Sequence, residues 1–428
     1  MKKENITWAV IIPLIGGLPI GVQHATGKFP EYVLSYDLFQ HNDQHYINYL
    51  REKGWKGKYY VIDESKNNVI PNITTNFKRL KKVNVVCGVP PCAGLSSLSN
   101  AASADSAVND WMINASEYVL SNVKPEVYFF ENAPRLATSK GAPVADKLYN
   151  IAKSHGYNFL IYSTESRLHG SPQIRPRTYG FFLKKSHFDN KLFKLFNFTK
   201  ERTNFLDLMN VVESKPDDPM NVLINKNTPT DDPYFVYCME QSGITDYTEF
   251  VKKFAKLEKS QNILELAISM ANNDHEILAN WMSVHNYEKE VKRCLYRKMK
   301  VEDGKGYYTH GLTVARGQTP AFIGVLPHCL AHPTENRFLT LREALTIMDM
   351  PQDFNIVGDN PVKYANHICQ NVCAFVARDM MHNIIFWLTG ENKNSINETF
   401  AIQRHRQNDI ISKTPDDEKI YESDELFE

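Results

Sequence analysis

Short apolar runs alternate with stretches of helical spacing from the start of the chain to about Leu183. Four of these runs have the composition of buried strands, at residues 9–12, 31–37, 83–86 and 129–130. This alternation predicts an α/β domain with a mostly parallel sheet. Because ligands gather at the carboxyl ends of such strands, we expect a site in the turns that follow these runs.

Two of these turns carry reactive side chains. Cys92 follows Pro90 and Pro91, which restrict the backbone that presents the thiol. A thiolate on a rigid loop at a strand end is a candidate nucleophile, although a lone cysteine is more often just a small buried residue. Glu131 ends the next apolar run. A carboxyl group with a raised pKa at that place can act as an acid.

The first turn has a different pattern. Gly16 and Gly17 open a predicted helix, and Asp37 ends the next strand about 20 residues later. This order is typical of dinucleotide-type sites, in which the acid accepts hydrogen bonds from ribose hydroxyls. Asp37 also fits the plainer role of a helix N-cap.

The composition changes at Lys184, where lysine, asparagine, aspartate and aromatic residues become frequent. Helical spacing of apolar residues then runs over 249–273 and 274–299. We predict four segments: a first part of the α/β domain, a second and smaller domain, a returning part of the first domain and a polar acidic tail, at 1–185, 186–334, 335–390 and 391–428. The last 13 residues hold seven acids and one lysine, which is typical of a solvated or disordered tail.

The charges are balanced, with 49 basic and 49 acidic residues and a formal net charge of zero. This balance argues against a histone-like binder of polyanions but leaves room for a local basic cleft. One basic cluster has interleaved tyrosines: Tyr287, Lys289, Lys292, Arg293, Tyr296, Arg297, Lys298 and Lys300. The cluster predicts contact with a nucleic-acid backbone through Arg293 and Arg297, and its plainer interpretation is a solvated helix face.

The seven cysteines are scattered and form no Cys-x-x-Cys pair, so we expect no zinc ribbon and no metal. Free thiols fit a reducing cytoplasm. The apolar stretch at 8–20 is too short to cross a bilayer, and Pro13, Gly16 and Gly17 interrupt it. We therefore expect a cytoplasmic protein, in a bacterial or a virus-infected cell, that does not bind membranes.

Four elements resemble motifs of the cytosine carbon-5 DNA methyltransferases. Residues 90–96, Pro-Pro-Cys-Ala-Gly-Leu-Ser, resemble the Pro-Cys loop of that family, and residues 130–133 resemble its Glu-Asn-Val element. Residues 169–177 match its Gly-x-Pro-Gln-x-Arg-x-Arg element. Residues 337–344, followed by 350–354, match its Arg-x-Leu-Thr-x-Arg-Glu-Ala…Phe-Pro-Asp-Asp-Phe element. The motifs occur in the family's order, so the resemblance covers most of residues 7–185 and 335–380.

The resemblance implies a Rossmann-like fold, in which 1–185 and 335–390 form the catalytic domain and 186–334 forms a target-recognition domain. It also implies a covalent mechanism on a flipped-out base. Cys92 would add to carbon 6 of cytosine, and Glu131 would engage nitrogen 3. Arg175 and Arg177 alternate in an extended stretch and so share a face, from which they would bind the base, orient Glu131 or grip phosphate. Asn132 would hold one of the two loops by backbone hydrogen bonds. Ser96 and Gln173 complete the expected substrate set, and Arg342 is expected to pair with Glu343.

The same resemblance implies S-adenosylmethionine as the cofactor. The residues expected to bind it are Ile15, Gly16, Gly17, Asp37, Asp63, Pro90 and Gln370. Two places depart from the family pattern. Leu14 stands where the family has its first glycine, and Cys369, Gln370 and Cys373 stand where it has glycine, asparagine and proline. These changes raise a modified S-adenosylmethionine as an alternative donor, with Gln370 donating a hydrogen bond to it.

The leading interpretation is an enzyme that methylates carbon 5 of cytosine in double-stranded DNA, of the restriction–modification or viral kind. We expect it to be a monomer. Two alternatives stay open: the same chemistry on RNA, and a catalytically silent nucleic-acid-binding protein that has kept the fold. The long segment at 186–334 favours DNA over RNA, and the joint presence of Cys92, Glu131, Arg175 and Arg177 argues against a silent protein.

Overall fold

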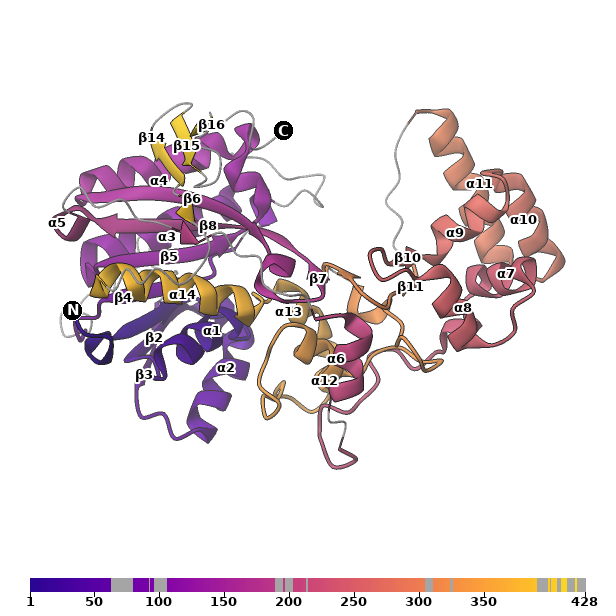
Figure 1. Ribbon diagram of the computed structural model, residues 1–428, viewed down its shortest axis with the longest axis horizontal. Helices are drawn as coiled ribbons and strands as arrows, with labels where there is room; N and C mark the ends of the chain where they lie inside the picture. The colour runs from indigo at the N-terminus through magenta and orange to yellow at the C-terminus, as the bar shows by residue number, and fades with distance from the viewer. Residues whose placement is uncertain are drawn as a thin grey trace.

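A computed structural model describes the chain at residues 1–62, 80–91, 93–95, 106–188, 195–196, 203–212, 215–304, 311–323, 326–390, 399–400, 402–405, 409–413 and 420–421. Figure 1 shows a sheet with helices packed around it and, apart from it, a smaller group of helices. Each has a hydrophobic core of its own.

The large domain is built on a seven-stranded sheet in the order β3-β2-β1-β4-β5-β8-β6. The strands, in chain order, are β1 (Trp8–Ile11), β2 (Tyr32–Tyr36), β3 (Lys58–Ile62), β4 (Val85–Gly88), β5 (Val127–Asn132), β6 (Tyr157–Glu165) and β8 (Pro176–Lys184). The four predicted strands correspond to β1, β2, β4 and β5. All neighbours are parallel except β8, which runs antiparallel to both β5 and β6. The α/β Rossmann-like fold predicted from the sequence is confirmed.

Helices from both ends of the chain cover this sheet. They are α1 (Gly17–Thr26), α2 (Gln40–Glu52), α3 (Asp110–Tyr118), α4 (Ala142–Ser154) and α14 (Ala374–Thr389). Helix α14 packs directly on α1 (Figure 1). The approach is close because Gly21 has no side chain: a Cβ there would lie 2.6 Å from the Cβ of Ala377. The carboxyl-terminal segment thus completes the core that the amino-terminal segment begins.

Five helices make up most of the smaller domain as far as the structure describes it. They are α7 (Pro233–Ser242), α8 (Tyr247–Phe254), α9 (Ile263–Met270), α10 (His275–Val284) and α11 (Glu288–Glu302). The expected helical stretches at 249–273 and 274–299 are therefore each divided in two. A short strand interrupts the first of them, and Asn286, with φ 63°, lies in the break of the second.

The core of the smaller domain includes residues from Tyr234 to Phe338. Phe205, Met209, Met220 and Ile224 lie in the core of the sheet domain instead. The first part of the predicted 186–334 segment therefore packs with the large domain.

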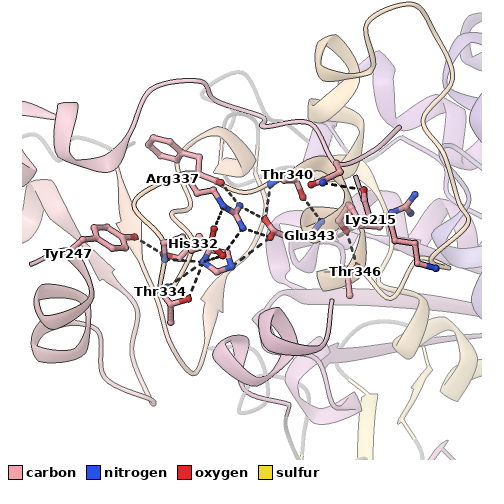
Figure 2. A network of polar contacts seen from close by, with 12 residues as sticks. Lys215, Tyr247, His332, Thr334, Arg337, Thr340, Glu343 and Thr346 are labelled. Carbon is pink, nitrogen blue, oxygen red and sulfur yellow. Dashed lines mark hydrogen bonds and ion pairs between the residues drawn. The ribbon is translucent and has the colours of Figure 1, made fainter. Parts of the chain in front are cut away.

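A polar network lies where the chain passes between the domains (Figure 2). Arg337 contacts Glu343 at 2.7 Å, and Glu343 accepts the backbone N–H of Thr340, which caps α12 (Leu341–Ile347). Tyr247 of α8 donates its hydroxyl to the carbonyl of His332 at 2.6 Å. The network ties the helical domain to the start of α12.

The expected pairing of Arg342 with Glu343 was wrong. Arg342 pairs with Asp218 at 2.6 Å, while Glu343 pairs with Arg337. Adjacent residues on a helix point in directions about 100° apart and do not face each other. Each of the two charges therefore takes a partner from another part of the chain.

The remaining elements are short. They are α5 (Lys185–Phe188), α6 (Phe205–Val211), α13 (Ala365–Gln370), β7 (Gln173–Ile174) paired with β12 (Thr319–Pro320), β9 (Leu195–Phe196) with β13 (Thr399–Phe400), β10 (Gln261–Asn262) with β11 (Thr313–Val314), and β14 (Ile402–His405), β15 (Asp409–Lys413) and β16 (Ile420–Tyr421). The described parts of the segment expected as a tail are thus strands. Among the helices in the described ranges, none combines the length and the apolar character that a membrane span requires.

Candidate active site

The first turn of the sheet domain is strained and tightly packed. Ile12 and Leu14 both have φ of 52°, although neither is glycine and Ile12 is β-branched. Gly16 has φ 109° and lies against Tyr46, whose ring would be 2.6 Å from a Cβ at that position. The backbone at Leu14 therefore keeps a conformation that suits glycine, although the glycine itself is absent.

Asn371 closes this turn from the far end of the chain. Its Oδ1 accepts the backbone N–H of Gly17 at 2.8 Å, and a Cβ on Gly17 would overlap the carbonyl of Val372. Asn371 is buried, whereas Gln370 is exposed and contacts Asn42 on α2. Asn371 therefore contacts the glycine turn, at the place where the sequence motif suggested Gln370.

Arg175 holds the same segment in place. Its buried guanidinium donates to the carbonyls of Cys369 at 2.8 Å and Asn371 at 2.7 Å, and to Phe322 at 2.9 Å. These contacts link the strand that carries Arg177 to the residue that caps the glycine turn. Arg175 therefore holds backbone segments in place. It was expected to share a face with Arg177, but the two guanidinium groups have different partners: backbone carbonyls for Arg175 and Glu131 for Arg177.

Three other expected cofactor residues lie along the same edge of the sheet. Ile15 is buried in the first turn, and Pro90 is buried after β4. Asp37 is exposed directly after β2, where it accepts a hydrogen bond from Gln40 at 2.9 Å. Asp63 lies outside the described residues.

The turn that presents the expected nucleophile is described up to Pro91 and again from Ala93. Cys92 and Ser96 themselves lie outside the described residues. Asn132 donates from its side-chain amide to the carbonyl of Pro90 at 3.3 Å, so β5 holds the end of β4. This is the backbone support that the sequence assigned to Asn132.

Glu131 and Arg177 form a buried ion pair two strands from the glycine turn. Glu131 on β5 lies opposite Tyr179 on β8, and Arg177 lies two residues further along the same face of β8. The Arg177 Nε is 2.6 Å from Glu131 Oε1, in a geometry that makes an ion pair but not an aligned hydrogen bond. Only 3% of Glu131 is exposed. Burial raises its pKa, although Arg177 and then Arg175 oppose the rise.

Gln173 is fully buried at the start of β7, and neither atom of its side-chain amide has a hydrogen-bond partner in the described part of the chain. Its backbone is fixed, because its N–H donates to Ser171 and its carbonyl accepts from Ser166. An orphaned amide in a protein interior is costly, so it is a position at which a ligand group or water would be bound.

Asp43 is a buried acid that the sequence did not single out. It lies on α2, accepts the hydroxyl of Tyr59 at 3.1 Å, and has one carboxyl oxygen without a partner among the described residues. Burial raises its pKa to about 8, against hydrogen bonds from Ser35, Tyr59 and the backbone of Leu14. Through its hydrogen bond with the backbone of Leu14, Asp43 therefore stabilises the strained first turn. Because the neighbouring residues at 40–46 are mostly polar, the sequence did not indicate that Asp43 is buried.

The two arginines expected to contact DNA are engaged within the helical domain. Arg293 pairs with Glu290 at 2.6 Å, and Arg297 donates to the hydroxyl of Tyr234 at 2.9 Å. By contrast, Lys289 and Lys292 are exposed on α11 and have no partner in the described structure. No group of three or more metal-binding side chains occurs in the ranges that the structure describes.

Comparison with known proteins finds similarity to cytosine methyltransferases over most of the chain. The family model for C-5 cytosine-specific DNA methylases matches residues 15–385. A type II methyltransferase of Bacillus paralicheniformis is 23% identical over 310 residues, which cover 67% of each chain. A protein assigned as a DNA (cytosine-5)-methyltransferase, CMT1 of Arabidopsis thaliana, is 23% identical over 377 residues, which are 72% of this chain and 45% of that protein.

Two solved structures share the fold. A DNA modification methyltransferase encoded by an Escherichia coli prophage has 16% identity and a TM-score of 0.52, and the match covers 90% of this chain and 100% of the other. The Entamoeba histolytica methyltransferase EhMeth has 12% identity and a TM-score of 0.50, covering 91% and 99%. The extent of the family match, together with the glycine turn and the Glu131–Arg177 pair, shows that this chain belongs to the C-5 cytosine-specific DNA methylase family.

Proposed function

We propose that this enzyme methylates carbon 5 of cytosine in double-stranded DNA, through a covalent adduct between Cys92 and a base that is flipped out of the duplex. The observation that carries the proposal is the buried Glu131, whose raised pKa and ion pair with Arg177 suit an acid that meets an uncharged base. Glu131 lies near the carboxyl end of β5, next to Asn132, which holds the turn that leads to Cys92.

The reaction needs both the Cys92 thiolate and the Glu131 carboxyl group. Carbon 5 of cytosine is a poor nucleophile until a thiolate adds to carbon 6. The new S–C6 bond moves an electron pair toward nitrogen 3, and Glu131 places a proton there. After carbon 5 has been methylated, its proton passes to a water molecule and the S–C6 bond breaks, which restores the thiolate. Nitrogen 3 returns its proton to Glu131, and the neutral aromatic ring is restored. Arg177 keeps the Glu131 carboxyl oriented throughout.

The residues at the first turn fit S-adenosylmethionine, which supplies the methyl group when it is bound. Gly16 and Gly17 bring bare backbone to the carboxyl end of β1, and the exposed Asp37 directly follows β2, in reach of solvent and of a ribose. Ile15 and Pro90 supply apolar walls. We propose the ordinary cofactor as the donor. Support for a modified donor rested on Gln370, which is exposed and contacts Asn42.

The proposal is tested by trapping. Wild-type protein incubated with duplex DNA containing 5-fluorocytosine and S-adenosylmethionine should form a complex that survives denaturation, because fluorine cannot leave carbon 5 as a proton does. Cys92→Ser should form none while it still binds the duplex. Cys329→Ser, at a half-buried cysteine outside the site, is the matched control and should trap like wild type.

Nucleoside mass spectrometry after co-expression separates the alternatives. Methylation of carbon 5 in DNA supports the proposal, and methylation confined to RNA would move the substrate to RNA. A protein that binds duplex DNA but yields no modified nucleoside, with or without Cys92, would be the catalytically silent alternative.

A further inference from the structure

A second concave site lies at the opposite edge of the sheet from the candidate active site. Tyr32 and Lys58, the first residues of β2 and β3, line it, whereas the glycine turn and Asp37 follow the carboxyl ends of β1 and β2. The cavity has a volume of about 600 Å³. This is within the range of small-molecule pockets in proteins.

Positive charge dominates this cleft. Four lysines line it, Lys28, Lys56, Lys58 and Lys81, against a single carboxylate, Glu31, so its net charge is +3. Glu31 is already paired with Lys81 at 2.7 Å. The Lys28 ammonium is held by the backbone carbonyls of Glu4 and Ile6, which leave its charge uncompensated.

The two remaining lysines are the ones available to a ligand. Lys56 and Lys58 are exposed, and neither has an ion-pair or hydrogen-bond partner in the described structure. They flank Gly57 and so carry two ammonium groups within one short segment. A phosphate with two negative charges is the ligand group that such a pair suits.

Aromatic side chains form the rest of the wall. The Trp55 indole is fixed by its N–H, which donates to the Pro30 carbonyl at 2.7 Å, and Tyr32 and Tyr60 pack edge to face at 6.3 Å between ring centroids. Phe29 is 38% exposed at the rim. The Tyr32 hydroxyl is buried without a hydrogen-bond partner in the described ranges, which leaves a donor to be satisfied.

We propose that this cleft binds a phosphate-bearing ligand that also carries a planar base, either a free nucleotide or the end of a nucleic-acid single strand. The lysines provide for the phosphate, and the exposed ring of Phe29 provides a surface on which a base stacks. The site is separate from the methylation site, since the two lie at opposite edges of the sheet.

The test uses the full chain and four probes: thymidine 5′-monophosphate, a ten-residue oligothymidylate, thymidine and inorganic phosphate. Binding is measured by calorimetry at low salt, without methyl donor, so that the result does not depend on the methylation reaction. The variant is Lys56→Gln with Lys58→Gln. Its matched control is Lys147→Gln with Lys153→Gln, which removes the same charge from two exposed positions on α4.

The proposal predicts that the monophosphate or the oligonucleotide binds wild type and the control alike, and at least about tenfold more weakly to the Lys56/Lys58 variant. Phe29→Ala should cost these two probes about fivefold or more and leave inorganic phosphate unaffected. If the monophosphate and the oligonucleotide bind equally well, the ligand is a nucleotide. If only the oligonucleotide binds, the ligand is the end of a strand. The proposal would be overturned if neither the monophosphate nor the oligonucleotide bound, or if the Lys56/Lys58 variant bound them like wild type. It would also be overturned if inorganic phosphate or thymidine bound as tightly as the monophosphate.

Discussion

Gly17 donates its backbone N–H to Oδ1 of Asn371 at 2.8 Å, although 354 residues separate the two. The carbonyl of Asn371 in turn accepts from Arg175 at 2.7 Å. The glycine turn of β1, the arginine before β8 and the segment before α14 are therefore parts of one assembly. A change in any of them should be felt at the cofactor end of the site.

Asn371→Ala should weaken both the fold and the cofactor pocket. It leaves the buried Gly17 N–H without an acceptor, which costs about 1–3 kcal/mol in the free energy of unfolding. The affinity for S-adenosylhomocysteine should fall at least about fivefold. Calorimetry and urea unfolding measure the two effects. Gln370→Ala, at the exposed neighbouring residue, is the control and should change neither. An equal effect of the two variants would contradict the assignment to Asn371.

Glu131→Gln should slow the chemical step about 10²-fold or more, because the variant cannot give up a proton to the base. Binding of duplex DNA should be retained. The active form of the wild type has a protonated Glu131, so its single-turnover rate should fall as the pH rises through the raised pKa of this group. Glu126→Gln, one residue before β5, is the control. Rates that match wild type would remove Glu131 from the mechanism.

The two arginines of the motif should differ in their effects. Arg175→Met leaves three backbone carbonyls without their donor and should lower the free energy of unfolding by at least about 2 kcal/mol. Arg177→Met should spare stability and change the rate. Since Arg177 lowers the pKa of Glu131, its loss should move the fall in rate to higher pH. If both variants lost stability and the rate of Arg177→Met kept the pH dependence of wild type, both arginines would have structural roles.

DNA binding should depend on the exposed face of α11. Replacing Lys289, Lys292 and Lys300 by glutamate should weaken duplex binding and reduce the salt slope by about 0.9 for each phosphate contact that is lost. The same change at Arg293 and Arg297 should instead destabilise the helical domain, because these two already contact Glu290 and Tyr234. Filter binding over a range of salt, with urea unfolding beside it, distinguishes the sets. A slope unchanged by the lysine variant would place the DNA elsewhere.

Asp43 should make stability depend on pH. Its pKa is about 8 in the folded chain and 3.8 as an ordinary value, so between these values the folded state holds a proton that the unfolded state has released. Stability should therefore fall as the pH rises from about 4 to 8, by up to about 1.4 kcal/mol per pH unit. Asp43→Asn should flatten this dependence in urea unfolding and leave the variant more stable than wild type at pH 8. A variant with the same pH dependence would assign the effect to other groups.

The strands and the position of Glu131 could be predicted because they depend on local sequence. Continuous apolar runs mark parallel strands that are buried on both faces, and a charged residue that ends such a run lies at the edge of the sheet. The support that Asn132 gives to Pro90 follows from the same adjacency of strands.

Other features depend on contacts that local sequence does not encode. Gln370 and Asn371 are neighbours of similar chemistry, and only the approach of the glycine turn decides which of them points inward. Apolar spacing at 274–299 continues across the break at Asn286, because both helices bury residues in one core. Asp43 is buried by packing from β2 and β3, which no pattern within α2 records.

The packing of α14 on α1, with Ala377 against Gly21, has a consequence for synthesis on the ribosome. About 350 residues must be added after Gly21 before its partner exists, which takes on the order of 20–70 seconds at common rates of translation. During that time the helical domain, whose core begins at Tyr234, can emerge and fold by itself, while the face of α1 stays uncovered. The nascent chain should therefore need a chaperone for its first helix, and no fragment that stops before α14 should acquire the glycine turn in its finished form.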